Sequence, residues 1–151
     1  MSTFPLFIVL VKDNLKLENQ LCFPLYVCSK EIVKSYKPEL EKLDLTYTQY
    51  IAMLVMWETK QINVKKIGER LFLDSGTLTP LLKKLEQKGY IVRERSKDDE
   101  RNLIISITKK GANLKEKAKD IPNKVGKCIN LNPKEAKELY RILYKILDKI
   151  N

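Results

Sequence analysis

Residues Asn63–Thr108, NVKKIGERLFLDSGTLTPLLKKLEQKGYIVRERSKDDERNLIISIT, decide the fold. In the first part of this stretch apolar residues recur at i, i+3, i+7 and i+8, the spacing that places side chains on one face of a helix. These residues are Val64, Ile67, Leu71 and Phe72. We therefore expect a helix that buries this apolar face, Phe72 included.

A second helix is predicted over residues 75–87. Asp74 or Ser75 stands where a side chain accepts hydrogen bonds from the first free N–H groups of a helix, and Gly89 suits the C-cap. One side of this helix is apolar and carries Leu78, Leu81, Leu82 and Leu85. The other side carries hydroxyls near the start and lysines further along, namely Ser75, Thr77, Thr79, Lys83 and Lys84. This order is typical of a recognition helix, whose start faces base edges while its cations neutralise phosphates.

Two β-rich runs, residues 90–95 and 102–108, follow and are joined by the charged hexapeptide SKDDER. Their pattern predicts a hairpin. Arg93 and Arg95 on the first strand suit phosphate contacts, and Arg101 at the tip suits the narrow minor groove of DNA. The other interpretation is a solvated turn in which the acids pair with the arginines. Helix, turn, helix and hairpin in this order predict a winged helix-turn-helix, a mainly α fold with a small β-hairpin wing.

Two helices are predicted upstream, over residues 21–35 and 45–59. Pro38 marks a boundary between them, because the residue before a proline avoids the helical conformation. Thr46 and Gln49 have the spacing of a capping box for the second helix.

Two further helices are predicted downstream. Thr108 suits the N-cap of the first, which Pro122 would kink or end. The last helix has the clearest start in the chain, since Asn132 suits the N-cap, Pro133 the N1 position and Glu135 the N3 position.

The last helix carries an apolar seam at heptad spacing, made of Ala136, Leu139, Leu143, Ile146 and Ile150. The seam either folds back on its own chain or forms a homodimer. DNA binding favours the dimer, because two-fold symmetry places two recognition helices about 34–36 Å apart on a pseudo-palindromic operator. We expect a single domain, with dimerisation helices at about 15–44 and 109–151 and a DNA-binding region at about 45–108.

Charge and length bound the function. Lys and Arg total 29 against 19 Asp and Glu, a net charge of +10 that indicates an anionic partner. With the motif above, we expect that partner to be double-stranded DNA and not a membrane, since no apolar run approaches the roughly 20 residues that span a bilayer. The apolar residues 4–11 lack the flanks of an export signal, the less favoured alternative, so we expect an N-terminal strand or arm and a cytoplasmic protein.

Conventional catalytic and metal sites find little support. The chain has three cysteines, Cys22, Cys28 and Cys128, at spacings that match no metal site, and it has no histidine. It also has no glycine-rich phosphate loop and no dinucleotide fingerprint. We therefore expect no enzyme, no cofactor and no metal.

These residues resemble the MarR-type regulators, and more closely their organic-hydroperoxide-sensing branch. The resemblance runs from about residue 15 to the C-terminus. It is strongest in LENQLCF at 17–23, LTYTQY at 45–50, LDSGTLTPLLK at 73–83 and DDER at 98–101.

The resemblance implies a redox-gated repressor whose signal is an organic hydroperoxide. Cys22 matches the peroxide sensor of that branch, Tyr36 and Tyr47 match tyrosines that hydrogen-bond the sensor thiolate, and Tyr26 matches a further nearby tyrosine. A thiolate attacks the peroxide O–O bond, and N–H groups at a helix start and phenol donors both favour the charged form. The product is a sulfenic acid, which a second thiol captures as a disulfide. Cys128 lies where some members carry that thiol, so an intersubunit Cys22–Cys128 bridge is the preferred hypothesis.

Other interpretations of these residues remain open. Free cysteines are usually buried as small hydrophobes, which is how we interpret Cys28, with thiol capture as its alternative. Tyr36 and Tyr47 would equally serve as core or interface residues. Pro24 departs from the family pattern, so either the helix starts near Phe23 with Cys22 at its electropositive end, or it is kinked.

Three other functions would fit parts of the pattern. The first is a regulator of the same type controlled by a small aromatic ligand. The second is a thiol peroxidase, against which the basic recognition module stands. The third is a non-specific DNA-coating protein, which predicts steep salt dependence and little sequence preference.

Overall fold

The computed structural model describes residues 14–97 and 102–150. Its contacts divide the chain into two units, Met1–Ser35 and Tyr36–Asn151, which are described separately. The first unit contains a short 3-10 helix η1, Leu17–Asn19, and helix α2, Cys22–Ser35. The predicted arm at residues 4–11 and the wing tip with Arg101 lie outside the described residues.

Helix α2 starts at Cys22, so Pro24 lies in its first turn. Pro24 is the third residue of the helix, where a backbone N–H has no partner within the helix and its loss breaks no bond. The first of the two expected arrangements is therefore confirmed, with Cys22 at the helix start.

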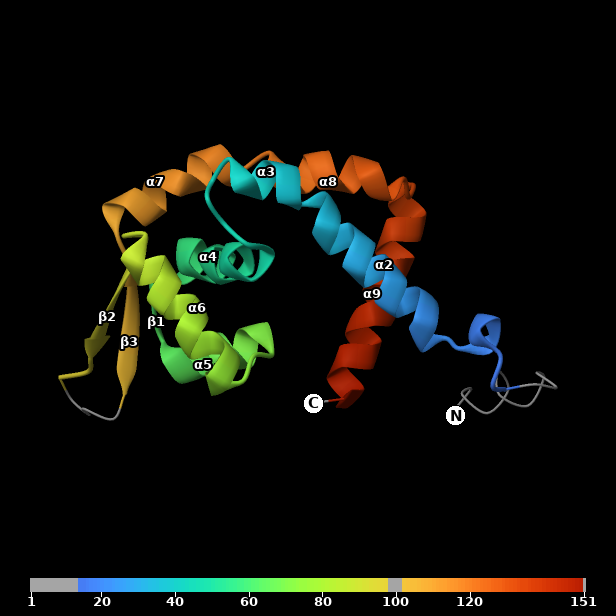
Figure 1. Cartoon of the computed structure of the whole chain (residues 1–151), viewed down its shortest axis with the longest axis horizontal. Helices are drawn as coiled ribbons and strands as arrows, with labels where there is room; N and C mark the ends of the chain where they lie inside the picture. The colour runs from blue at the N-terminus through green and yellow to red at the C-terminus, as the bar shows by residue number, and fades with distance from the viewer. Residues whose placement is uncertain (1–13, 98–101, 151) are drawn as a thin grey trace. The chain divides into compact units, whose positions relative to one another are not determined.

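The second unit is mainly helical with one small sheet (Figure 1). Its elements in chain order are α3 Lys37–Glu41, α4 Tyr47–Thr59, β1 Gln61–Asn63, α5 Val64–Leu71, α6 Ser75–Gln87, β2 Ile91–Arg95, β3 Leu103–Ile107, α7 Lys109–Ala118, α8 Ile121–Ile129 and α9 Pro133–Ile150. Helices α5 and α6 with the β2–β3 hairpin form the winged helix-turn-helix, so the predicted fold class is confirmed.

The core lies where α4, α5 and α6 meet the sheet. The four leucines predicted for the buried side of α6 are all buried, and Ile67, Ile91 and Ile105 are fully buried around them. Phe72 was expected among these residues, and that prediction is wrong, since its side chain is 60% exposed. Phe72 has a left-handed φ of 53° after the last residue of α5, so it leaves the apolar face of that helix.

The sheet has three antiparallel strands in the order β1-β3-β2. The predicted hairpin pairs Ile91 with Ile107 and Arg95 with Leu103. Strand β1 was not predicted, because three residues are too few to show an alternating pattern; it pairs Ile62 with Ile105 on the central strand.

The predicted capping residues of α4, α7 and α9 are confirmed. Thr46 and Gln49 form the capping box of α4, and the Thr108 side chain accepts a hydrogen bond from the Gly111 N–H at the start of α7. Asn132 and Glu135 cap α9 in the same reciprocal way. After Ser35 and Ala118 the chain starts new helices with Pro38 and Pro122 in their first turns, so these prolines begin helices as well as separating them.

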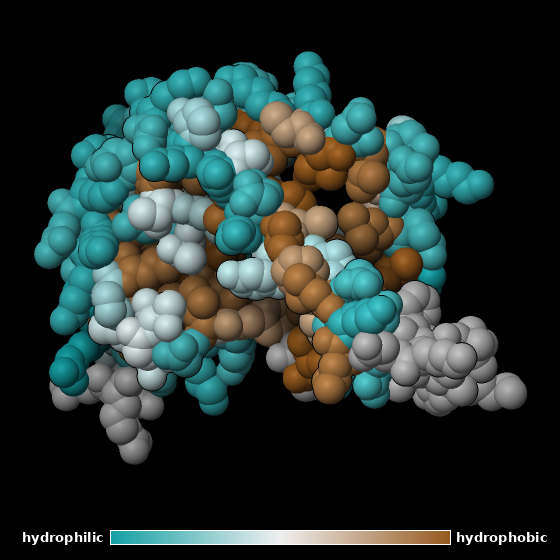
Figure 2. Space-filling model, turned by 45° about the vertical axis from the view of Figure 1, so that its right-hand side comes forward, coloured by the Kyte–Doolittle hydropathy of each residue, from teal (hydrophilic) through white to brown (hydrophobic). Residues whose placement is uncertain are grey.

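Apolar side chains also remain at the surface, where Figure 2 shows brown patches beside the hydrophilic teal. Helix α9 has no buried residue, and Leu139 and Ile150 are 42% and 70% exposed. Within α9 the residues Leu143, Ile146 and Leu147 are half-buried. No helix among the described residues is long and apolar enough to cross a membrane.

Helix α7 touches the backbone of the hairpin at Gly111. A Cβ atom built on Gly111 would lie 2.1 Å from the Tyr90 carbonyl oxygen. The Gly111 carbonyl accepts a hydrogen bond of 2.8 Å from the Trp57 ring nitrogen. Only a glycine permits this approach, which connects α7, α4 and the hairpin.

Replacing Gly111 with Ala is expected to lower the free energy of unfolding by about 2–3 kcal/mol, because backbone must move to admit one methyl group. Gly126 is the matched control, a glycine in α8 with open space around its Cβ position. Gly126→Ala is expected to raise the same free energy by about 0.5–1 kcal/mol. Urea unfolding at one fixed protein concentration measures both, and equal stability of the two variants would contradict the close contact.

Candidate nucleic-acid interface and cysteine sites

The start of α6 is fixed by Asp74, which lies at its N-cap. The Asp74 carboxylate accepts hydrogen bonds of 2.9 Å from both the N–H and the hydroxyl of Thr77. These bonds hold the pKa of Asp74 below its usual value. The Thr77 hydroxyl proton therefore serves the cap, and only its oxygen lone pairs remain for another partner.

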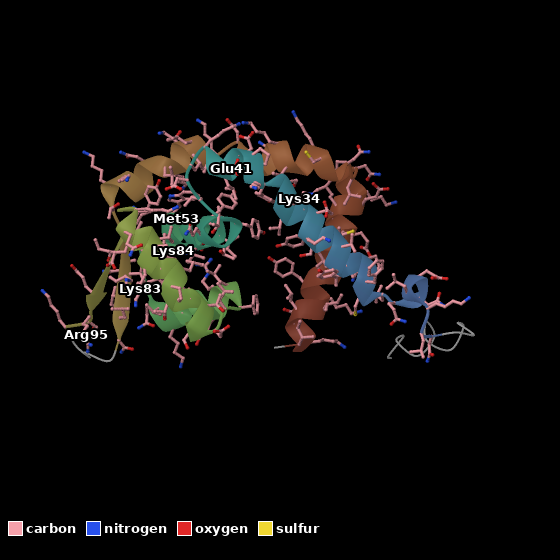
Figure 3. The ribbon with its side chains drawn as sticks, in the orientation of Figure 1. Lys34, Glu41, Met53, Lys83, Lys84 and Arg95 are labelled. Atoms are coloured by element: carbon pink, nitrogen blue, oxygen red, sulfur yellow. The ribbon has the colours of Figure 1, made fainter. Side chains whose placement is uncertain are left out.

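The remaining polar residues predicted on α6 are open to solvent. Ser75 and Thr79 are exposed near its start, and Lys83 and Lys84 are exposed further along. Figure 3 shows both lysines on α6 and Arg95 on β2. Gln87, a polar residue outside the predicted set, is also exposed on the last turn of α6.

Arg93 is occupied inside the protein. Its Nε and Nη2 donate to Glu86 Oε2 at 2.8 and 2.6 Å, and its backbone N–H donates to Glu86 Oε1 at 3.0 Å. The hydrogen bonds from Arg93 lower the pKa of Glu86. A phosphate contact by Arg93 would have to share the guanidinium with Glu86.

Lys88 is a second cation that the fold uses internally. Its ammonium lies 3.0 Å from the Asp44 carboxylate and 3.3 Å from the side-chain oxygen of Gln49, which is buried. Lys88 therefore joins the end of α6 to the start of α4. Arg95 is exposed at the end of β2.

The three cysteines are free thiols, and all are exposed. Cys22 is the first residue of α2, and Cys128 lies in α8, where its Sγ contacts the Lys124 carbonyl oxygen at 3.6 Å. Cys28 was expected to be a packing residue, but it is exposed on the described chain, where its helix α2 has no buried residue.

Tyr36 and Tyr47 are brought together by the fold. Their ring centroids lie 5.0 Å apart in an edge-on arrangement, and Tyr50 packs 5.8 Å from Tyr36. Burial raises the pKa of both Tyr36 and Tyr47, so both phenols keep their protons at neutral pH. Tyr26 lies on α2 and is exposed, with the Lys30 ammonium 5.7 Å from its ring centroid.

The described ranges contain no candidate metal site. No group of three or more Asp, Glu or Cys side chains within them is arranged to hold a metal ion.

Comparison with known proteins places the chain in a family. The sequence profile of the transcriptional regulators SarA/Rot matches residues 34–118. The organic hydroperoxide resistance transcriptional regulator of Bacillus subtilis (strain 168) is 52% identical over 139 residues, which cover 92% of this chain and 95% of that protein. The HTH-type transcriptional regulator SarZ of Staphylococcus aureus (strain USA300) is 48% identical over 137 residues, covering 91% and 93% of the two chains.

A solved regulator, AbfR of Staphylococcus epidermidis, supports the same placement. The reduced form of AbfR bound to DNA has a TM-score of 0.73 and 36% identity, covering 89% of this chain and 94% of that one. A disulfide-formed AbfR has a TM-score of 0.63 and 37% identity, covering 87% and 92%. These relatives are transcriptional regulators and not enzymes, and they confirm the resemblance drawn from the sequence. The chain belongs to the MarR-type winged helix-turn-helix transcriptional regulators, in the group of the organic hydroperoxide resistance regulators and SarZ.

Proposed function

We propose that this DNA-binding regulator is a homodimeric repressor that leaves a pseudo-palindromic operator when an organic hydroperoxide oxidises Cys22. The observation that carries the proposal is the exposed thiol of Cys22 at the first residue of α2. It stands in a chain 52% identical to a regulator named for organic hydroperoxide resistance. A thiolate is the form of cysteine that attacks a peroxide, and exposure lets the peroxide reach the sulfur. The protein would act on DNA in the cytoplasm.

The recognition helix supplies the proposed base contacts. Ser75 and Thr79 have exposed hydroxyls, and Thr77 offers only acceptor lone pairs, since its proton serves Asp74. Thr77 would therefore face base N–H donors, such as the amino groups of adenine and cytosine.

Cations beside this helix supply the proposed phosphate contacts. Lys83 and Lys84 are exposed on α6, and Arg95 is exposed at the end of β2. Arg101 stays a proposed minor-groove residue, and a phosphate contact by Arg93 would share its guanidinium with Glu86. The net charge of +10 supports attraction to the DNA backbone.

We propose that sensing takes place in two displacement reactions, oxidation of Cys22 and then formation of the disulfide. The Cys22 thiolate attacks the terminal peroxide oxygen, so an S–O bond forms, the O–O bond breaks, and an alkoxide leaves to take a proton as the alcohol. The Cys128 thiol of the partner subunit then attacks the sulfenic sulfur, forming the disulfide and releasing water. Tyr36, Tyr47 and Tyr26 are proposed to donate hydrogen bonds to the thiolate; the burial that raises the pKa of Tyr36 and Tyr47 supports this role, because it keeps them protonated.

The dimer proposal is supported by α9. This helix contributes no buried side chain to its own chain, although its apolar residues follow a heptad spacing. A second copy would cover the seam, and the assembly would then contain Cys22 of one chain together with Cys128 of the other. Bridging them would shift the recognition helices out of the spacing that suits the operator.

Cys22→Ser is expected to bind DNA from upstream of the protein's own coding sequence as tightly as the parent, but to stay bound after one equivalent of cumene hydroperoxide. Fluorescence anisotropy at one stated salt concentration measures binding, and non-reducing gels with intact mass follow the thiols. Cys128→Ser should lose the dimer-sized band, while the control Cys28→Ser should behave as the parent. Release of Cys22→Ser by the oxidant would contradict the proposal. Tight binding by the parent that no oxidant changes would favour a small aromatic ligand as the signal.

Lys83→Gln and Lys84→Gln are each expected to weaken binding and to reduce the slope of log K against log salt by about 0.9, the value for one lost phosphate contact. Lys145→Gln, an exposed lysine of α9 outside the helix-turn-helix, is the control and should leave the slope unchanged. Unchanged slopes for both α6 variants would remove these lysines from the interface.

A further inference from the structure

The junction between α6 and β2 is held by one arginine and one carboxylate. Glu86 lies in the last turn of α6, and Arg93 is the central residue of β2. Both carboxylate oxygens of Glu86 are used, one by the guanidinium and the other by the backbone N–H of Arg93. The backbone bond matters most, because it fixes the position of the strand itself in addition to that of a flexible side chain.

We infer that Glu86 and Arg93 form a clamp that sets the orientation of the wing relative to the recognition helix, so that both are positioning residues for DNA binding. The inference rests on DNA binding by α6 and the wing, and it is independent of the redox switch. It also replaces the role expected for Arg93 from the sequence, a direct phosphate contact.

The base of the hairpin is held next to Gly89, which has a φ of 73°. The Gly89 N–H donates to the Glu86 carbonyl, the Tyr90 N–H donates to the Leu85 carbonyl, and Ile91 is fully buried. The clamp adds a bond two residues beyond Ile91, at the middle of β2. Arg93 pairs with Ile105 on β3, the central strand, so whatever fixes β2 also fixes the hairpin. The clamp therefore constrains the whole wing, including Arg95 two residues further along.

The Arg93–Glu86 pair is less exposed than the Arg70–Glu58 and Arg141–Glu138 pairs of the same unit. The side chains of Arg93 and Glu86 are only 19% and 35% exposed, against 60% and 56% for Arg141 and Glu138 in α9. Water competes less for a shielded pair, and a guanidinium with two N–H bonds to one carboxylate is geometrically specific. Both pairs use Nε and Nη2 of the arginine, so Arg141–Glu138 is a matched control within a single helix.

The charge of Glu86 and the proposed clamp predict opposite effects of its removal on DNA affinity. A carboxylate on a recognition helix repels phosphates, so removing it should tighten DNA binding if Glu86 had no other role. A winged helix, however, must present its helix to the major groove and its wing to the flanking DNA at the same time. If loosening the wing lowered the aligned population to about a tenth, the apparent affinity would fall about tenfold.

The test compares Glu86→Ala, Glu86→Gln and Arg93→Gln with the controls Glu138→Ala and Arg141→Gln. Binding is measured by anisotropy at four salt concentrations, with a labelled duplex from upstream of the coding sequence and a scrambled duplex. We expect Glu86→Ala to bind the first duplex about tenfold more weakly although it removes a negative charge. Glu86→Gln should lose less, since its amide oxygen still accepts the Arg93 N–H. Arg93→Gln should weaken binding with no change in salt slope, and the controls should match the parent.

Either of two binding results would overturn the clamp. One is parental or tighter binding by Glu86→Ala, and the other is a loss of about 0.9 in the salt slope of Arg93→Gln, the mark of a direct phosphate contact. Hydrogen exchange on the free proteins gives a reading without DNA: the Arg93 amide should exchange faster in Glu86→Ala, while the α6 core amides stay protected as evidence of folding. If the parent bound neither duplex, the proposed function would fail, and unchanged exchange at the Arg93 amide would separately overturn the clamp.

Discussion

Burial of the leucine face of α6 is the constraint on which the rest of the structure depends. Leu78, Leu82 and Leu85 are almost completely buried against the core. Each such side chain contributes about 2 kcal/mol by leaving water. Rotating α6 about its axis would expose them, so the leucines fix which residues of the helix face outward. The exposed hydroxyls and lysines of α6 owe their direction to this packing.

Much of the fold was readable from the sequence because its determinants are local. A capping side chain lies within three residues of the N–H group it serves, as with Asp74 and Thr77, so sequence spacing alone reveals it. The helical period of the leucines likewise needs no knowledge of what packs against them. For α2 the structure had only to choose between a start near Phe23 and a kink at Pro24.

The features that were missed depend on tertiary contacts. Strand β1 exists because β3 offers it an edge, and three residues carry no period of their own. Phe72 fits the apolar stripe of α5 by spacing, yet the chain leaves the helix one residue earlier and turns the ring outward. Arg93 counts as a surface cation by composition, whereas its partner Glu86 is seven residues away and meets it only after the chain has reversed. The net charge therefore overstates the number of unpaired cations near α6, because Arg93 and Lys88 both form ion pairs within the fold.

Helix α9 has a consequence for the amount of working regulator in a cell. None of the α9 side chains is fully buried in the single chain, so the proposed homodimer would add to the hydrophobic stabilisation of this helix. If a second copy supplies that surface, dilution separates the chains and removes stabilisation from each of them. The level of functional protein would then rise more steeply than the rate of its synthesis, and a scarce chain would be the one most open to proteolysis.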